Sequence, residues 1–342
     1  MTTPQLSPHA EALRAELMPV FQAECRASVE LLRMTPLAGG ASMETWALDV
    51  VVDQQAESWV LRRDMGSNMS EQALSRRDEA AVIEAARLHG VSAPRVRFVA
   101  PHDAPRGWFV MERRPGESVG RRVVSLPELA HAREGLARSL GRELAAIHSV
   151  PAAAVEAHLR SEPLAPTEAA TEGLRAVSQR IARHNPVWAL AFRWLDAHRP
   201  PETGRRCLVH GDFRIGNLLV TPQGLSAVLD WEFAHLGDPH EDLAWITVRD
   251  WRFERDALEV GGVGSLDDFI AGYAEAGGEA VDRARVRWWA MLGNLRWSVM
   301  CHAQAERHLS GIDRSVEYAS LGRKSAEIDW EILNLLRTEP SP

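Results

Sequence analysis

The stretch CLVHGDFRIGNLLVTPQGLSAVLDWEFAHLGDPHEDLAWI, residues 207–246, alternates short apolar runs with acidic and amide side chains. His210 and Asp212 follow one apolar run, and Asn217 comes five residues after Asp212. Asp230 ends a later apolar run. Strand ends that open into loops present polar groups at the rim of a sheet in this way. A His-Gly-Asp tripeptide alone is common in loops, but the whole combination is specific and predicts a magnesium-dependent phosphoryl-transfer site.

The length and composition indicate a globular protein with room for two lobes, each with its own core. The chain has 342 residues, of which 45% are hydrophobic and 25% are charged. Its net charge of −8 argues against a nucleic-acid partner, which would require a basic face for the phosphates. No apolar run approaches the roughly 20 residues of a membrane helix. We therefore expect no nucleic acid and no membrane as partners.

The cysteines form neither a disulfide framework nor a metal-spaced pair. Cys25, Cys207 and Cys301 are odd in number and far apart in the sequence, which favours a reducing compartment. The first residues lack the basic start and apolar core of a signal peptide. These features predict a cytoplasmic protein, and no pattern indicates its oligomeric state.

The first part of the chain, residues 1–112, has the pattern of a small antiparallel sheet with an inserted helix. We expect helices over residues 8–32 and 70–89, the second capped by Ser70, and five strands in the parts between and after them, including residues 45–52, 59–63, 95–100 and 108–112. A glycine-rich turn over residues 39–43 separates the first two strands. Such a turn can lay its amides against phosphate oxygens, although most Gly-Gly turns only reverse the chain.

The second part, residues 113–342, is predicted to be mostly helical. Helices are expected over residues 126–147, 266–276, 281–309 and 314–336. Nine of the 12 tryptophans lie from Trp188 onward, so this part is expected to hold the larger aromatic core. The chain is thus expected to have an α+β fold of two lobes, with the division after Glu112.

Phosphoryl transfer requires an oriented alcohol, metal ions that bridge the phosphates, and cationic donors on the transferred group. Asp212 can accept a hydrogen bond from a substrate hydroxyl and orient or deprotonate it. Asn217 and Asp230 offer the oxygen ligands that Mg²⁺ prefers. Arg214 can reach the transferring phosphate as a charge-assisted donor.

These motifs resemble those of the aminoglycoside phosphotransferase/choline kinase family. The resemblance rests on His210-Gly-Asp212 with Asn217, and on Asp230 followed by Gly-Asp-Pro and by Asp242. It implies a protein-kinase-like bilobal fold, with a small N-terminal nucleotide-binding lobe and a larger, mostly helical lobe for catalysis and substrate binding. It also implies that ATP is the co-substrate, that Asp212 is the catalytic base and that Asn217 and Asp230 bind Mg²⁺. Asp242 would brace the catalytic loop from a helix.

The resemblance extends into the first lobe. By analogy with the family, a phosphate-binding hairpin, a glutamate that pairs with a basic residue, and a hinge whose backbone holds adenine are expected there. The residues that match these parts are Gly39, Gly40 and Ser42 for the hairpin, Glu79 for the glutamate, and Met111 and Glu112 for the hinge.

The chain departs from the family at the basic residue. The family has a lysine on the third strand, but the only lysine here is Lys324 and the matching position is Arg62. Strand alternation places Val60 and Arg62 on one face and Arg63 on the other. Arginine pairs with phosphate through two contacts and keeps its charge. An Arg-Arg pair here resembles the branch that includes kinase domains fused to acyl-CoA dehydrogenases.

The predicted function is the ATP- and Mg²⁺-dependent transfer of the γ-phosphate to a hydroxyl group of a small molecule, with the acceptor left open. His240, Glu241 and the segment 288–302 are expected to face the acceptor, although any one of these residues could instead pack in the core. A second hypothesis is a catalytically weak or inactive kinase-like nucleotide-binding protein, because the usual lysine is missing. A third is a metal-dependent phosphohydrolase using Asp212 and Asp230, which leaves the glycine-rich turn unexplained.

Overall fold

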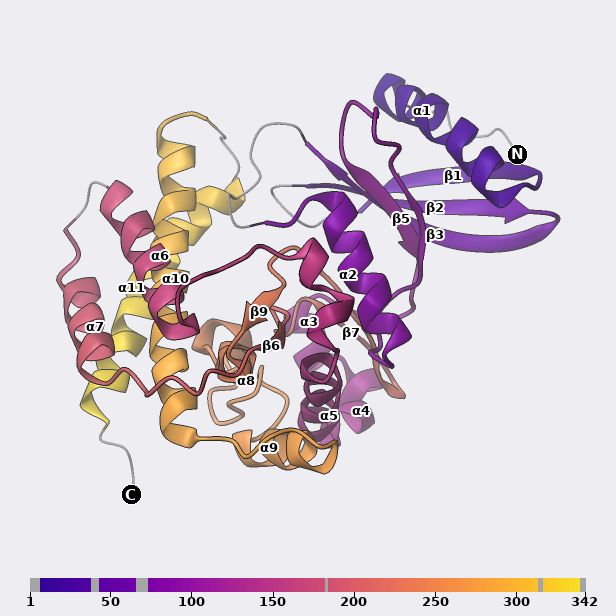
Figure 1. Cartoon of the computed structure of the whole chain (residues 1–342). Coiled ribbons are helices and arrows are strands. Elements are labelled where there is room, and N and C mark those ends of the chain that lie inside the picture. Colours follow the sequence, from indigo (N-terminus) through magenta and orange to yellow (C-terminus); the bar gives the residue numbers. More distant parts are fainter. Residues whose placement is uncertain (1–6, 38–42, 66–72, 182–183, 313–315, 339–342) are drawn as a thin grey trace.

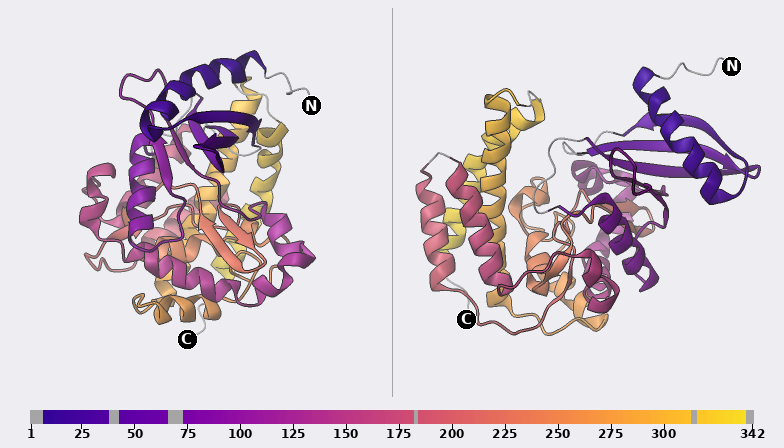
Figure 2. Two further views of the ribbon diagram at one scale, coloured as in Figure 1. Left: turned by 90° about the vertical axis from the view of Figure 1, so that its right-hand side faces the viewer. Right: turned by 45° about the horizontal axis from the view of Figure 1, so that its top comes forward.

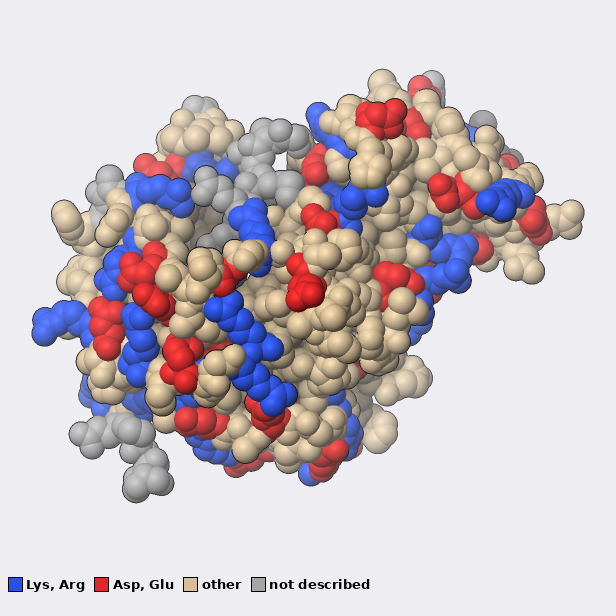
Figure 3. Space-filling model, viewed as in Figure 1, with Lys and Arg blue, Asp and Glu red and all other residues tan. Residues whose placement is uncertain are grey.

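The computed structural model describes residues 7–37, 43–65, 73–181, 184–312 and 316–338. They form two lobes, a smaller one built on an antiparallel sheet and a larger, mostly helical one (Figure 1). The predicted α+β class is therefore confirmed. On the face shown in Figure 3, basic and acidic side chains are interspersed.

The first lobe is a five-stranded sheet in the order β1-β2-β3-β5-β4, and every neighbouring pair is antiparallel. The strands are β1 (Val29–Pro36), β2 (Met43–Val52), β3 (Gln55–Asp64), β4 (Val96–Val99) and β5 (Trp108–Glu112). The helix α2 (Arg76–Leu88) is inserted between β3 and β4. Its N-cap is Ser75, whose hydroxyl accepts a hydrogen bond from the Asp78 amide, so the prediction of Ser70 as the cap is wrong.

The N-terminal helix is shorter than predicted. The helix α1 (Pro8–Cys25) ends at Arg26, which adopts a left-handed φ of 50°. The prediction of a helix over residues 8–32 is wrong in its last part, because Val29 and Leu31 alternate with exposed residues and are buried in the sheet. The alternating burial is that of a half-buried strand.

The two faces of the sheet belong to different hydrophobic cores. On the outer face, Phe21 of α1 packs against Trp59 and Phe98, with ring centroids 5.3 Å and 5.0 Å away. Figure 2 shows α1 lying across this face, on the side away from the second lobe. On the inner face, Val60 and Phe109 join the core that continues into the helical lobe. The inner face of the sheet is therefore the one that meets the second lobe.

The second lobe is mainly helical. Its longer helices are α5 (Leu136–His148), α6 (Pro166–Arg180), α7 (Pro186–Ala197), α9 (Leu266–Glu275), α10 (Arg283–Leu309) and α11 (Val316–Arg337). The expected helix over residues 126–147 is instead divided into a 3₁₀ turn (Pro127–Leu129), α4 (Ala130–Glu134) and α5, and the short helix α3 (Gly120–Ser125) precedes it. Pro127 lacks the amide needed to continue a helix, and Gly135 interrupts the chain before α5.

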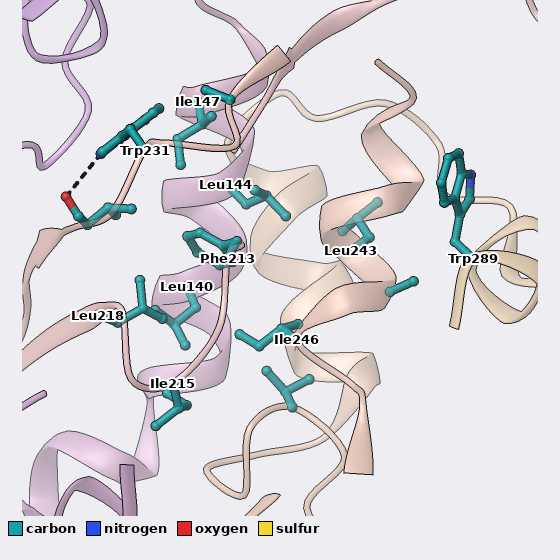
Figure 4. Packing of buried hydrophobic residues seen from close by; sticks show 14 of the residues in the cluster. Leu140, Leu144, Ile147, Phe213, Ile215, Leu218, Trp231, Leu243, Ile246 and Trp289 are labelled. Atoms are coloured by element: carbon teal, nitrogen blue, oxygen red, sulfur yellow. Dashed lines mark hydrogen bonds between the residues drawn. The ribbon is translucent and has the colours of Figure 1, made fainter. Parts of the chain in front are cut away.

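Two short sheets hold the segment that carries the polar motif of residues 207–246. Strand β6 (Cys207–Val209) pairs with β9 (His235–Gly237), and β7 (Leu218–Thr221) pairs with β8 (Gly224–Val228). The short helix α8 (Pro239–Trp245) follows β9. Figure 4 shows apolar side chains from α5, from the loop after β6 and from α8 packed together: Leu140, Leu144, Phe213, Ile215, Leu243 and Ile246. This packing anchors the loop that ends in Asn217.

Within the described ranges, none of the helices combines the length and apolar character needed to cross a bilayer.

Candidate active site

The loop between β6 and β7 is fixed by a buried carboxylate from α8. The amides of His210 and Gly211 donate to the Asp242 carboxylate at 2.7 Å and 3.0 Å. Nε2 of His148 lies 3.3 Å from the same carboxylate. Burial alone would raise the pKa of Asp242, but the hydrogen bonds and the nearby histidines lower it. Asp242 therefore braces the loop as an anion.

His210 is a structural residue of this loop. Its side chain is buried, and burial lowers its pKa, which favours the neutral imidazole. Nδ1 accepts a hydrogen bond from the Asp212 amide at 3.2 Å, and Nε2 lies 3.0 Å from the Leu229 carbonyl oxygen. The neutral ring with its proton on Nε2 satisfies both contacts. His210 thus joins the loop to the end of β8.

The carboxylate of Asp212 accepts hydrogen bonds from three side chains. Nε1 of Trp245 donates to Oδ1 at 2.6 Å, and Nε of Arg214 donates to the same oxygen at 3.0 Å. Nδ2 of Asn217 donates to Oδ2 at 2.6 Å. Asn217 and Arg214 were predicted as site residues. Trp245 was not, because nothing local in the sequence connects it with Asp212.

Asp230 faces the first lobe. Its backbone adopts a left-handed φ of 67°, a conformation that is uncommon for a residue with a Cβ and that concentrates at functional sites. Nη2 of Arg62 lies 2.6 Å from its Oδ1. Burial alone would raise the pKa of Asp230, but the charge and hydrogen bond of Arg62 lower it. Asp230 is therefore an anion paired with a cation of the other lobe.

Arg62 also meets Glu79, as the sequence predicts. Nη2 of Arg62 lies 3.2 Å from Oε1 of Glu79, which is fully buried on α2. On the same strand, Arg63 points to the opposite face and pairs with Glu16 of α1 at 2.7 Å. The predicted alternation of Val60, Arg62 and Arg63 about the strand is therefore confirmed.

A second arginine, Arg76, completes the charge network and was missed from the sequence. It is 1% exposed and forms a short ion pair with Glu79. It also lies 3.1 Å from Asp64 and 3.4 Å from Glu232. The signal that could have found it is its spacing of three residues from Glu79 on one helix, where side chains are neighbours.

Glu232 is the unusual acid of this network. Burial, together with the nearby carboxylates of Asp230 and Glu79, raises its pKa to about 7. The amide of Leu74 donates to the Glu232 carbonyl oxygen at 2.7 Å, so the segment before α2 is tied to the second lobe. The two lobes are therefore joined by backbone as well as by charge.

The structure describes only part of the predicted nucleotide site. Gly39, Gly40 and Ser42 lie outside the described residues. In the hinge, Met111 pairs with Val60 on β3 and with Val96 on β4. The amide of Glu112 donates to the Arg95 carbonyl oxygen at 2.9 Å. This amide is therefore already engaged in the sheet.

Comparison with known proteins identifies the family. Residues 33–289 match the profile described as "Phosphotransferase enzyme family". The chain belongs to this family. The chain is 30% identical over 195 residues to acyl-CoA dehydrogenase family member 10 of Mus musculus, a match that covers 54% of the chain and 18% of the mouse protein. It is 24% identical over 307 residues to the probable acyl-CoA dehydrogenase IBR3 of Arabidopsis thaliana, which covers 82% of the chain and 37% of that relative. The predicted family and branch are thereby confirmed, although the chain spans well under half the length of these relatives.

Solved structures agree on the fold. An aminoglycoside phosphotransferase candidate from Ralstonia eutropha superposes with a TM-score of 0.72 at 20% identity, covering 95% of this chain and 98% of that one. A thermostable mutant of aminoglycoside phosphotransferase APH(4)-Ia, in a ternary complex with AMP-PNP and hygromycin B, gives a TM-score of 0.64 at 15% identity, covering 95% and 100%. These likenesses confirm the predicted protein-kinase-like bilobal fold.

Beside Asp212, the chain has a cluster of three tryptophans. Trp251 lies between Trp245 and Trp297, with ring centroids 5.5 Å and 4.8 Å apart. The guanidinium of Arg214 lies 4.5 Å from the centroid of Trp251, and that of Arg296 lies 5.0 Å from the centroid of Trp245. Such contacts between a cation and an aromatic face are attractive.

The residues expected on the acceptor side lie in two different surroundings. Glu241 and Arg296 lie at this cluster, where Oε1 of Glu241 is 3.3 Å from Nη1 of Arg296. In contrast, His240 is buried and bound to Asp238 at 2.9 Å. Asn294 is also buried and donates within its own helix to the Ala290 carbonyl oxygen at 2.8 Å. These two polar side chains belong to the core because each finds its partners there.

Proposed function

We propose that this phosphotransferase moves the γ-phosphate of ATP to a hydroxyl group of a small molecule, with Mg²⁺ as cofactor. The observation that carries the proposal is the placement of Asp212 beside Asn217, with Asp230 bound to Arg62 of the first lobe. In this proposal, the Asp212 carboxylate receives the alcohol. The Asp230 carboxylate lies next to the guanidinium of Arg62, a cationic group that can bind phosphates.

Asp212 serves as the base in this proposal. Its carboxylate is fixed by Trp245, Arg214 and Asn217, so it is oriented before substrate binds. A carboxylate held in this way accepts the hydroxyl hydrogen of the acceptor and directs its oxygen at the phosphate. Arg214 keeps guanidinium N–H groups beyond its contact with Asp212, and these suit an oxygen of the transferring phosphate.

Asn217 and Asp230 fit Mg²⁺ by the chemistry of their donor atoms. Asn217 uses its Nδ2 for Asp212, and no described residue donates to its side-chain oxygen. Asp230 offers Oδ1 to Arg62 and is 31% exposed. Carboxylate and amide oxygens are magnesium ligands, and phosphates and water usually complete the shell. When bound, Mg²⁺ would neutralise charge on the phosphates. Among the described residues, no group of three or more His, Cys, Asp or Glu side chains forms a metal cluster, so the protein alone supplies few ligands.

Arg62 is proposed to bind the phosphates in place of the family's lysine. The Nε of its buried guanidinium has no hydrogen-bond partner among the described residues. Glu79 orients the group from α2, through the contact of its Oε1 with Nη2 of Arg62. Gly39, Gly40, Ser42, Met111 and Glu112 are proposed to complete the nucleotide site. The complex of APH(4)-Ia with AMP-PNP makes ATP the first nucleotide to test.

The acceptor is proposed to be an alcohol that is not a polycation. Arg214 and Arg296 stack on tryptophans near Asp212, and Lys324 lies 2.6 Å from Asp250 in the same region, where Trp297 also binds Asp250. Such cations disfavour a polyamine and suit a neutral or anionic molecule. We also propose that the nucleotide lobe is residues 1–112, the catalytic lobe is residues 113–342, and the protein is cytoplasmic.

The test is a coupled ADP-release screen over hydroxylated metabolites and aminoglycosides, with wild-type protein and Asp212→Asn in parallel. We expect release that requires one class of alcohol and Mg²⁺ and that is lost in Asp212→Asn. ATP binding without release across the whole panel would support the alternative of an inactive nucleotide-binding protein. Equal release in both proteins would reject Asp212 as the base.

A further inference from the structure

The helix α8 contacts the catalytic loop at two points. Asp242 binds the loop backbone at His210 and Gly211, and Trp245 binds the side chain of Asp212. Asp242 and Trp245 are three residues apart, so they project from the same face of the helix. One short helix therefore fixes both the path of the loop and the orientation of its carboxylate.

We propose that Trp245 is a positioning residue, which holds Asp212 in the orientation needed to receive the acceptor's hydroxyl hydrogen. The inference rests on the proposed function, since it takes Asp212 to be the base. Without the indole N–H, Oδ1 of Asp212 would keep only Arg214 as its donor. Because Arg214 is expected to serve the phosphate, the carboxylate, held on its other oxygen by Asn217 alone among the described residues, could then turn with the guanidinium away from the acceptor.

The indole is itself held in place from several sides. It is 6% exposed, and it packs against Trp251 and under the guanidinium of Arg296. On α10, Gly293 leaves the space for its six-membered ring, because a Cβ at that position would lie 3.2 Å from Cε3 of Trp245 and 3.2 Å from Cγ2 of Val248. A methyl group there would press on the indole without removing its N–H. Gly293→Ala is therefore a variant that moves Trp245 while leaving its chemistry intact.

The hydrogen bond can be tested without any turnover. In protein labelled with ¹⁵N at tryptophan, Trp245→Phe identifies the indole resonance of Trp245 by its loss. We expect this resonance to lie at the low-field end of the indole region and to shift more than any other indole signal in Asp212→Asn, because its acceptor changes from a carboxylate to an amide. A resonance that is unmoved in Asp212→Asn would overturn the contact.

The positioning role is tested by steady-state kinetics of Trp245→Phe with Mg²⁺, ATP and the alcohol that gives the highest turnover in the screen. A hydrogen bond to a charged group contributes enough for a loss of about 10-fold or more in kcat. We expect that loss in Trp245→Phe, with the KM for ATP unchanged. Gly293→Ala should lower kcat in the same direction.

Trp188→Phe is the matched control. Its buried indole donates to the Ser298 hydroxyl at 2.9 Å, at the contact of α7 with α10 and away from Asp212. We expect lower thermal stability in this variant but an unchanged kcat. If Asp212→Asn is inactive while Trp245→Phe keeps the wild-type kcat, the positioning role fails and the proposed function stands. If Asp212→Asn keeps full activity, the base assignment itself fails.

Discussion

Nη2 of Arg62 lies 2.6 Å from Oδ1 of Asp230, and these residues are separated by 168 positions in the chain and belong to different lobes. The contact closes the charge network of the first lobe onto the carboxylate that we assign to Mg²⁺. In a metal–nucleotide complex, Arg62 can bind phosphate and Asp230 can bind the metal cation, so that the two groups no longer bind each other. Nucleotide binding is therefore expected to replace this ion pair by two new contacts.

The first prediction concerns Arg62. In Arg62→Ala the affinity for Mg²⁺·ATP should fall by about 10-fold or more, because a hydrogen bond to a charged group contributes about 1.5–3 kcal/mol. Titration calorimetry measures the change. Arg63→Ala is the control, since Arg63 lies on the opposite face with Glu16 and Glu44. It should lower stability and leave ATP affinity near the wild-type value. Equal losses of affinity in both variants would contradict the assignment.

Removing Arg76 should destabilise the first lobe. Arg76 is buried and is the closest cation to Glu79, so Arg76→Met leaves a buried carboxylate with only Arg62 as a partner. Breaking a buried pair in this way costs about 3–5 kcal/mol of the free energy of unfolding, measurable by urea denaturation. Arg76→Met combined with Glu79→Gln should recover part of the loss, because the uncompensated charge is gone. If Arg76→Met alone is as stable as the wild type, the charge network contributes little to the free energy of unfolding.

The brace at Asp242 is expected to matter for both stability and turnover. In Asp242→Asn, one of the two loop amides at His210 and Gly211 loses its acceptor, which costs about 1–3 kcal/mol for a buried donor. The loop then becomes less ordered, so kcat should fall while the affinity for nucleotide stays close to wild type. Kinetics and calorimetry on the same preparation separate these effects. An unchanged kcat in a destabilised variant would limit Asp242 to a folding role.

Stability should decrease between neutral and alkaline pH through His235. Burial alone would lower the pKa of His235, but the carboxylate of Glu241 raises it to about 9. The ordinary value is about 6.5, so the protonated form favours the folded state. This contribution is fully present below pH about 6.5 and is lost as the pH rises through about 9.

The Glu241→Gln variant tests this pH dependence. Its unfolding free energy should vary less over that pH window than that of the wild type, because the partner that raises the pKa of His235 is removed. The His235 side chain is 37% exposed, so solvent screens the pair and the difference should be modest. Denaturant titrations at several pH values measure it. If the unfolding free energies of the two proteins vary with pH in parallel, Glu241 is not the cause of the pH dependence.

The sequence predicts the parts of this protein that local pattern controls. The polar motif at His210, Asp212 and Asn217, the faces of Arg62 and Arg63, and the order of sheet lobe and helical lobe all follow from short-range spacing. The end of α1 at Arg26 was not predicted. Over so few residues, the apolar pattern of a strand, with every second residue apolar, cannot be distinguished from that of a helix, with every third or fourth residue apolar.

The contacts of the site were harder to predict than its residues. Trp245 reaches Asp212 across 33 positions, and Arg76 reaches Glu232 across 156. Both depend on which elements pack together, and a sequence pattern does not contain that information. The tryptophan was expected to be core, as most are, and it is buried. Its N–H gives it a second role that only the packed structure reveals.

The most direct test of phosphoryl transfer uses ATP labelled with ³²P at the γ-phosphate, incubated with Mg²⁺ and a fractionated extract of small metabolites. Products are separated so that labelled organic phosphate is distinguished from inorganic phosphate. The account predicts labelled organic phosphate with wild-type protein and none with Asp212→Asn. Label that appears only as inorganic phosphate, or equally in both proteins, would contradict it.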